Sequence, residues 1–169
     1  GGDDNRFDDK LFLENIKACE ENGISYGVYL YSYALDTQQA KDEASHVIRL
    51  LEGNGDNLKL GVWFDMEDAD GYKARNGMPS NEELVNICQT FSEEMTNAGY
   101  ENGVYANRDW LDNRLGGLDT QNIWLAQWGE TSYSDSYKMW QYAGDDGNVG
   151  RVAGINSLVD LNVCYVEGE

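Results

Sequence analysis

Two carboxylates stand two residues apart at the end of a segment with strand character. The apolar segment 58–64 (LKLGVWF) leads directly into Asp65 and Glu67. Alternate residues of a strand point to the same face, so the two carboxylates share one environment with the Trp63 indole. Like charges in a low dielectric raise the pKa of one partner, which then stays protonated beside an ionised neighbour. Glycoside hydrolysis uses this division between an acid and a carboxylate.

Two other interpretations of this pair remain open. The chain has 31 Asp and Glu residues, and a solvated acidic turn at the end of a strand gives the same pattern. The acidic segment 65–70 also offers oxygen ligands of the kind that Mg²⁺ and Ca²⁺ prefer, which would suit a metal-dependent hydrolase. A zinc site is not expected, because the sequence has neither a Cys-x-x-Cys pair nor a Cys/His cluster, and His46 is its only histidine.

Other strand ends carry side chains suited to carbohydrate, which presents apolar C–H faces and many hydroxyl groups. Aromatic rings pack on such faces, and amides both donate and accept hydrogen bonds. In parallel α/β architectures the working residues lie at the carboxyl ends of strands. For any single ring, packing in the core is the alternative. The predicted substrate-binding residues are Tyr33, Tyr105, Asn107, Trp128 and Gln141.

Hydrophobic periodicity predicts alternating helices and strands, which must position these side chains. Helical spacing covers 7–21, 38–52 and 80–97, where Ser80 and Glu83 suggest a capping box, and a short helix is expected over 108–113. β-Branched and aromatic runs predict strands over 24–34, 58–64, 102–106, 123–128, 138–142 and 159–163. A polar loop is expected between residues 68 and 79. This alternation predicts parallel strands joined by crossovers, so the fold class is α/β.

Composition limits the partners and the number of domains. The 169 residues fit one domain, 1–169, with 41% hydrophobic residues and no internal linker. The net charge of −19 repels phosphate backbones and anionic lipid, so nucleic acid is not an expected partner. No apolar run is long enough to predict membrane insertion.

The order of several segments resembles the glycoside hydrolase family 25 lysozymes, which are N-acetylmuramidases. The segments are GISYGVYLYSYA, VWFDMED, AGYENGVYAN, IWLAQW, MWQY and VDLN. The resemblance implies a flattened, TIM-barrel-like (β/α)5(β)3 fold. It also implies cleavage of the β-1,4 bond between N-acetylmuramic acid and N-acetylglucosamine in peptidoglycan, with no metal and no organic cofactor, by a secreted or cell-wall protein. By this resemblance Glu67 is the general acid, and Asp65 and Asp160 are its catalytic partners.

The start of the chain departs from the family pattern. Members open with two strands, the first of which carries an active-site Asp, and no segment before residue 7 matches either strand. We therefore expect a barrel that lacks its first two strands and self-associates through exposed strand edges. A carbohydrate- or cell-wall-binding module that keeps the cleft without catalysis is the alternative function.

Overall fold

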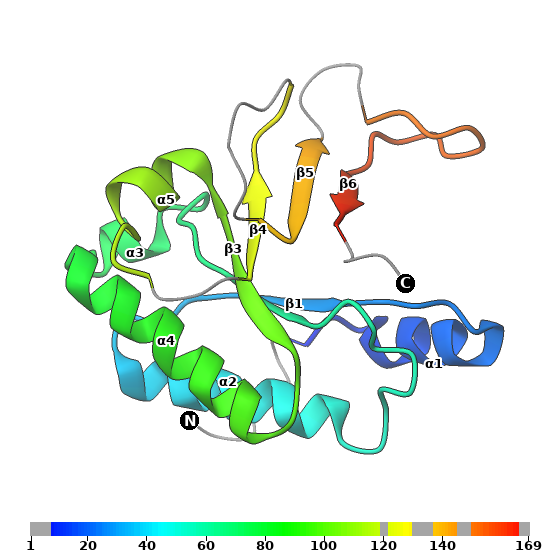
Figure 1. Ribbon diagram of the computed structural model, residues 1–169, viewed down its shortest axis with the longest axis horizontal. Helices are drawn as coiled ribbons and strands as arrows, with labels where there is room; N and C mark the ends of the chain where they lie inside the picture. Colours follow the sequence, from blue (N-terminus) through cyan, green and yellow to red (C-terminus); the bar gives the residue numbers. More distant parts are fainter. Residues whose placement is uncertain (1–7, 119–121, 130–136, 145–149, 166–169) are drawn as a thin grey trace.

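The computed structural model describes residues 8–118, 122–129, 137–144 and 150–165. The elements follow one another as α1 (Phe12–Asn22), β1 (Val28–Tyr31), α2 (Thr37–Leu51), β2 (Val62–Asp65), α3 (Tyr72–Arg75), α4 (Asn81–Asn97), β3 (Asn102–Asn107), α5 (Arg108–Asn113), β4 (Ile123–Ala126), β5 (Met139–Ala143) and β6 (Leu161–Cys164). The strands form one six-stranded sheet in chain order, with β1 to β5 parallel and β6 antiparallel to β5. The predicted α/β class is confirmed, and the described sheet is open and curled (Figure 1).

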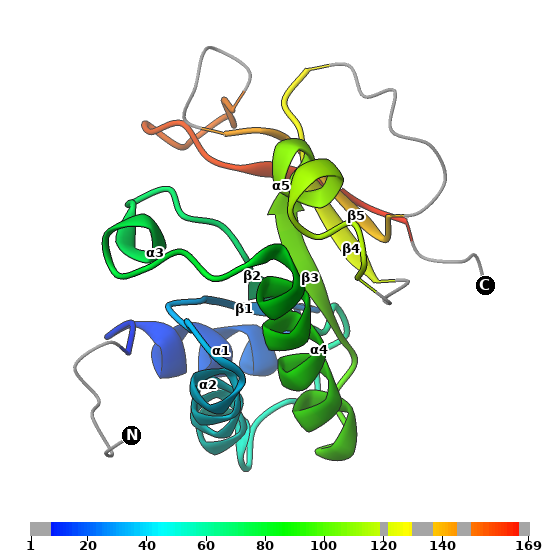
Figure 2. The same ribbon diagram turned by 90° about the vertical axis from the view of Figure 1, so that its left-hand side faces the viewer.

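The long helices begin where their sequences supply caps. The Asp36 carboxylate accepts the Gln39 N–H at 2.8 Å at the start of α2. The Ser80 hydroxyl accepts the Glu83 N–H at 3.2 Å at the start of α4, which confirms Ser80 as the predicted cap. The two helices pack side by side on one face of the sheet (Figure 2).

Several elements differ from the sequence prediction; the strand expected over 58–64, for example, begins at Val62. The helix expected over 7–21 begins at Phe12, after a turn in which Asp9 accepts the N–H groups of Leu11 and Phe12; residue 7 lies outside the described residues. The long strand expected over 24–34 shortens to β1. The predicted loop over 68–79 contains α3, which forms because Asp68 accepts the backbone N–H groups of Lys73 and Ala74.

The two faces of the sheet differ in character because side chains alternate along each strand. On one face, Phe64 stacks on Phe91 of α4 with ring centroids 4.1 Å apart, and Val62, Val104 and Leu125 are buried in the same core. The opposite face carries polar and aromatic side chains from neighbouring strands. The helices therefore anchor one face and leave the other to form a site.

β1 and β6 are the two edges of the described sheet. Tyr29 of β1 is 64% exposed on the polar face. No helix within the described ranges is long and apolar enough to cross a membrane.

Candidate active site

The carboxylate Asp65 ends β2 and lies in a row of paired residues that crosses four strands. The pairing register places Tyr31 beside Asp65, Asp65 beside Tyr105, and Tyr105 beside Trp124. Backbone hydrogen bonds continue past the strand end, because the Met66 N–H donates to Tyr105 O at 2.9 Å and the Ser32 N–H donates to Asp65 O at 3.0 Å. The sheet itself therefore fixes the backbone from which Asp65 and Glu67 project.

The Asp65 side chain is only 6% exposed. This burial is the main cause that raises its pKa, the Glu67 carboxylate raises it further, and Lys73 opposes both, which brings the pKa to about 8. Its Oδ1 has no hydrogen-bond partner among the described residues. A buried oxygen without a donor disfavours the charged form, so the Asp65–Glu67 pair keeps one proton at neutral pH.

Glu67 lies in the loop beyond β2 and is half-buried. Burial raises its pKa, Lys73 lowers it, and Asp70 raises it again, with a net upward direction. The two carboxyls therefore titrate as a coupled pair that holds a proton well above the ordinary range. The sequence analysis expects like charge to raise the pKa of one carboxyl, whereas in the structure burial is the larger cause.

Asp160 reaches the same region from the segment before β6. Burial raises the pKa of Tyr105, and the carboxylates of Asp65, Glu67 and Asp160 raise it further, so all three acids act on this one ring. A Cβ atom on Gly144 would lie 2.5 Å from the Trp128 ring and 3.0 Å from Asp160 Oδ1. Only glycine at this position permits their close approach.

Gln141 joins three of the predicted binding residues into one cluster. Its Oε1 accepts the Tyr105 O–H at 2.9 Å and the Trp128 Nε1–H at 3.3 Å. Gln141 is buried, whereas Trp128 is 45% exposed. The amide thus bonds to the half-buried phenol of Tyr105 on one side and to the accessible indole of Trp128 on the other.

Tyr33 belongs to a second aromatic group near Glu67. Its hydroxyl donates to Asp70 Oδ2 at 3.1 Å, and its ring lies 5.2 Å from Tyr31 and 4.9 Å edge-on from Tyr72. The sequence predicts no contact between Tyr33 and Asp70 or Tyr72. The contact depends on α3, which the sequence predicts as a loop.

Asn107 has a structural role at this edge of the sheet. Its side-chain oxygen accepts the Trp110 N–H at 2.9 Å and caps α5. That oxygen is therefore engaged in the fold, and the predicted contact of Asn107 with substrate stays a prediction.

Comparison with known proteins identifies the family. The family described as Glycosyl hydrolases family 25 matches residues 2–152. The chain belongs to this family. A comparison with curated protein sequences gave no match. Membership of a hydrolase family does not favour the binding-module alternative for this family 25 chain.

Solved structures resemble the family 25 chain over nearly its whole length. The modular autolysin LytC from Streptococcus pneumoniae, solved with a synthetic peptidoglycan ligand, has a TM-score of 0.78 at 28% identity over 93% of this chain and 38% of LytC. The Clostridium perfringens spore cortex lytic enzyme SleM (TM-score 0.72, 20% identity, 93% of this chain and 55% of SleM) has the same fold. So does the catalytic domain of endolysin ply40 from Listeria monocytogenes bacteriophage P40 (TM-score 0.73, 23% identity, 93% of this chain and 75% of ply40). The chain spans well under half the length of LytC.

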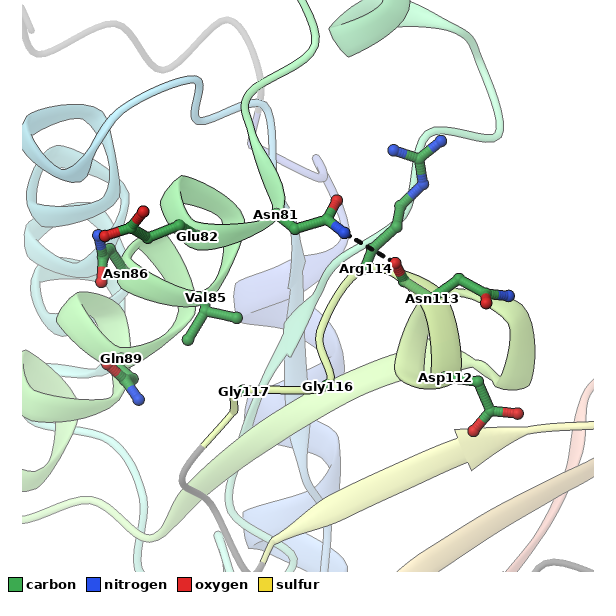
Figure 3. A pocket seen from close by; sticks show the side chains of 10 residues that line it. All are labelled: Asn81, Glu82, Val85, Asn86, Gln89, Asp112, Asn113, Arg114, Gly116 and Gly117. Atoms are coloured by element: carbon green, nitrogen blue, oxygen red, sulfur yellow. Dashed lines mark hydrogen bonds between the residues drawn. The ribbon is translucent and has the colours of Figure 1, made fainter.

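A groove of about 550 Å³ lies elsewhere on this family 25 chain, between the start of α4 and the end of α5 (Figure 3). At one end of the groove, the Asn81 side-chain amide donates a hydrogen bond to Asn113 O at 2.8 Å. None of the three acids lines it. In the part of the chain that the structure describes, no group of three or more His, Cys, Asp and Glu side chains is placed to hold a metal ion.

Proposed function

We propose that this chain is the catalytic domain of a peptidoglycan hydrolase that cleaves the β-1,4 bond between N-acetylmuramic acid and N-acetylglucosamine. The observation that carries the proposal is the coupled pair Asp65 and Glu67, whose pKa values are raised at a strand end lined by aromatic rings and an amide. Family 25 membership and the peptidoglycan ligand of LytC support this substrate class. Since the substrate lies outside the cell membrane, the site of action is the cell wall or the extracellular space.

In this mechanism Glu67 is the general acid. It is the more accessible of the pair, and its raised pKa keeps a proton available for the glycosidic oxygen. Transfer of that proton breaks the bond between carbon and the leaving oxygen, while Asp65 and Asp160 stabilise the oxocarbenium-like centre. Water then adds to the carbon, and its proton restores Glu67. The side chains that bind the sugars are those of Trp128, Tyr33, Tyr105, Asn107 and Gln141.

The test is lysis of purified cell walls. We expect turbidity to fall, with or without a chelator, and new reducing ends to appear on N-acetylmuramic acid. The assay uses this chain and a longer protein that extends upstream through the family's first two strands. No new reducing ends with either protein, or ends only on N-acetylglucosamine, would contradict the proposed bond. Loss of lysis with the chelator would favour the metal-dependent alternative.

The pH dependence of lysis should be bell-shaped with its optimum on the acid side, at roughly pH 5–6. Activity falls as the pH rises toward 8, because the pair then loses the proton that the reaction needs. The pKa values of Glu67 and Asp65 are both raised, that of Asp65 to about 8. It falls at low pH because the pair then takes up a second proton and no ionised partner remains beside the acid. Initial lytic rates in buffers of constant ionic strength measure this, and a flat profile from pH 4 to 9 contradicts paired-carboxylate catalysis.

We further propose that the complete fold is the family's flattened (β/α)5(β)3 barrel, to which two strands outside this chain add beside β1. The open edge of β1 and the 64% exposed Tyr29 support this. Sedimentation of the 169-residue chain should therefore reveal self-association, and its lytic rate should be far below that of the longer protein. A stable monomer with full activity contradicts the prediction.

A further inference from the structure

Lys73 is buried to an extent that is rare for lysine. Its side chain is 1% exposed, although it arises from the four-residue helix α3 on the substrate side of the sheet. Lysine is almost never fully buried unless its ammonium is paired. The functional role proposed above does not use this residue.

The Lys73 ammonium joins the ends of two neighbouring strands. Its Nζ donates to the carbonyl oxygen of Ser32, just beyond β1, and to the carbonyl oxygen of Glu67 at 3.1 Å, just beyond β2. These carbonyls belong to the segments that present Tyr33 and the Glu67 side chain. One cation thereby sets the spacing between the aromatic group and the acid.

Charged groups from several elements surround this ammonium. Burial lowers the pKa of Lys73, and Glu43, Asp68, Asp65 and the Cys88 thiol raise it. The Tyr31 ring lies 5.9 Å from Nζ. Burial is the largest of these effects, so the pKa of Lys73 is lowered overall, and the carboxylates limit that fall.

Glu43 of α2 contacts the same segment of chain as Lys73. It accepts the Ser32 hydroxyl at 2.9 Å and the Tyr33 N–H at 2.7 Å, so it contacts the segment that Lys73 also binds. Burial raises the pKa of Glu43 to about 7, against the lowering effects of these hydrogen bonds and of Lys73. Glu43 is thus both a counter-charge for Lys73 and a second support for Tyr33.

We propose that Lys73 is a positioning residue of the active site: its buried ammonium, bonded to the carbonyl oxygens of Ser32 and Glu67, fixes the Glu67 backbone against the end of β1 and places a positive charge beside Asp65 and Glu67. The catalytic consequence rests on the proposed function. The electrostatic consequence does not, because Lys73 lowers the pKa of both carboxyls whatever reaction they serve. Lys73 is not the only group that acts on these carboxyls. The Glu67 carboxylate raises the pKa of Asp65, and Asp70 raises the pKa of Glu67. Glu67 in turn raises the pKa values of Tyr31 and Tyr105.

The test replaces Lys73→Met alone and together with Glu43→Gln. The single variant leaves Glu43 buried without its cation and is prone to unfold, whereas the double variant removes both charges and keeps the shape. Lys138→Met is the matched control, since it removes the same charge from a lysine paired with the exposed Glu101 at 3.1 Å. Titration of the ¹³C carboxyl signals measures the pKa values of Asp65 and Glu67 in each protein.

We expect both carboxyl titrations to move upward by about one pH unit in the double variant and to stay in place in the control. In the longer, active protein the limbs of the pH–rate profile should move in the same direction, with kcat reduced more than KM changes. Unmoved carboxyl titrations in the folded double variant overturn the proposal. If walls are not lysed by the unsubstituted proteins but the titrations move, the proposed function fails and the electrostatic role of Lys73 stands.

A measurement on the unsubstituted chain tests the proposal even if the variants do not fold. In a pH titration followed by NMR, the ¹³C chemical shift of Lys73 Cε should be that of a charged ammonium across pH 5–8. A neutral amine in this range overturns the proposal without any substitution, and a charged one supports it.

Discussion

Replacement of Glu67 by glutamine is expected to reduce peptidoglycan hydrolysis by roughly 10²–10⁴-fold, the usual contribution of a general acid, in a protein extended through the family's first two strands. The amide keeps the shape and the hydrogen-bonding capacity of the side chain but has no proton to give to the glycosidic oxygen. Because Glu67 is half-buried and its pKa is raised by burial, the neutral amide should fold at least as well as the acid. Initial lytic rates and the melting temperature measure the two effects.

Glu93→Gln is the control for this substitution. Glu93 lies on the exposed side of α4, so the same chemical change there should leave lysis unaffected. Activity of the Glu67→Gln protein within a few-fold of the parent would remove Glu67 from the role of acid. A large loss in the control as well would show that the amide substitutions act through stability or wall binding.

Asp65→Asn is expected to stabilise the protein in alkaline solution while it abolishes lysis. The folded state raises the pKa of Asp65 from the ordinary 3.8 to about 8, chiefly by burial. The folded state therefore holds this proton more tightly than the unfolded state. Its stabilising contribution is complete below pH 3.8 and is lost as the pH rises through about 8.

The asparagine side chain has no such proton to lose. At pH 9 the variant should exceed the parent in free energy of unfolding by on the order of 5 kcal/mol, and near pH 4 the two should be similar. Urea unfolding at the two pH values measures the difference. Asp42→Asn on the exposed face of α2 is the control, and its difference from the parent should be small at both pH values. Equal pH dependence of the Asp65→Asn protein and the parent would show that Asp65 is ionised without cost in the folded state.

The order of helices and strands could be predicted from the sequence because its signals are local. The capping residue Ser80 and the apolar periodicity behind it predicted the start of α4, and the apolar and aromatic segment before Asp65 predicted β2. The placement of Asp65 and Glu67 together is also local, since residues two apart at a strand end share a face. α3 was missed because its start depends on side-chain contacts from Asp68, which periodicity does not register.

The site needed the tertiary structure because its distances and its dielectric are long-range properties. Asp160 acts on Tyr105 only because β6 returns along β5 and Gly144 admits the Trp128 ring. A lysine in a polar segment is predicted to be solvated. In the structure Lys73 is buried, and the carboxylates of Glu43, Asp65 and Asp68 act on its pKa. The sequence by itself determined which acids stand together at the end of β2. The tertiary structure decided how far water is excluded from them, and that exclusion raises the pKa of Asp65 to about 8.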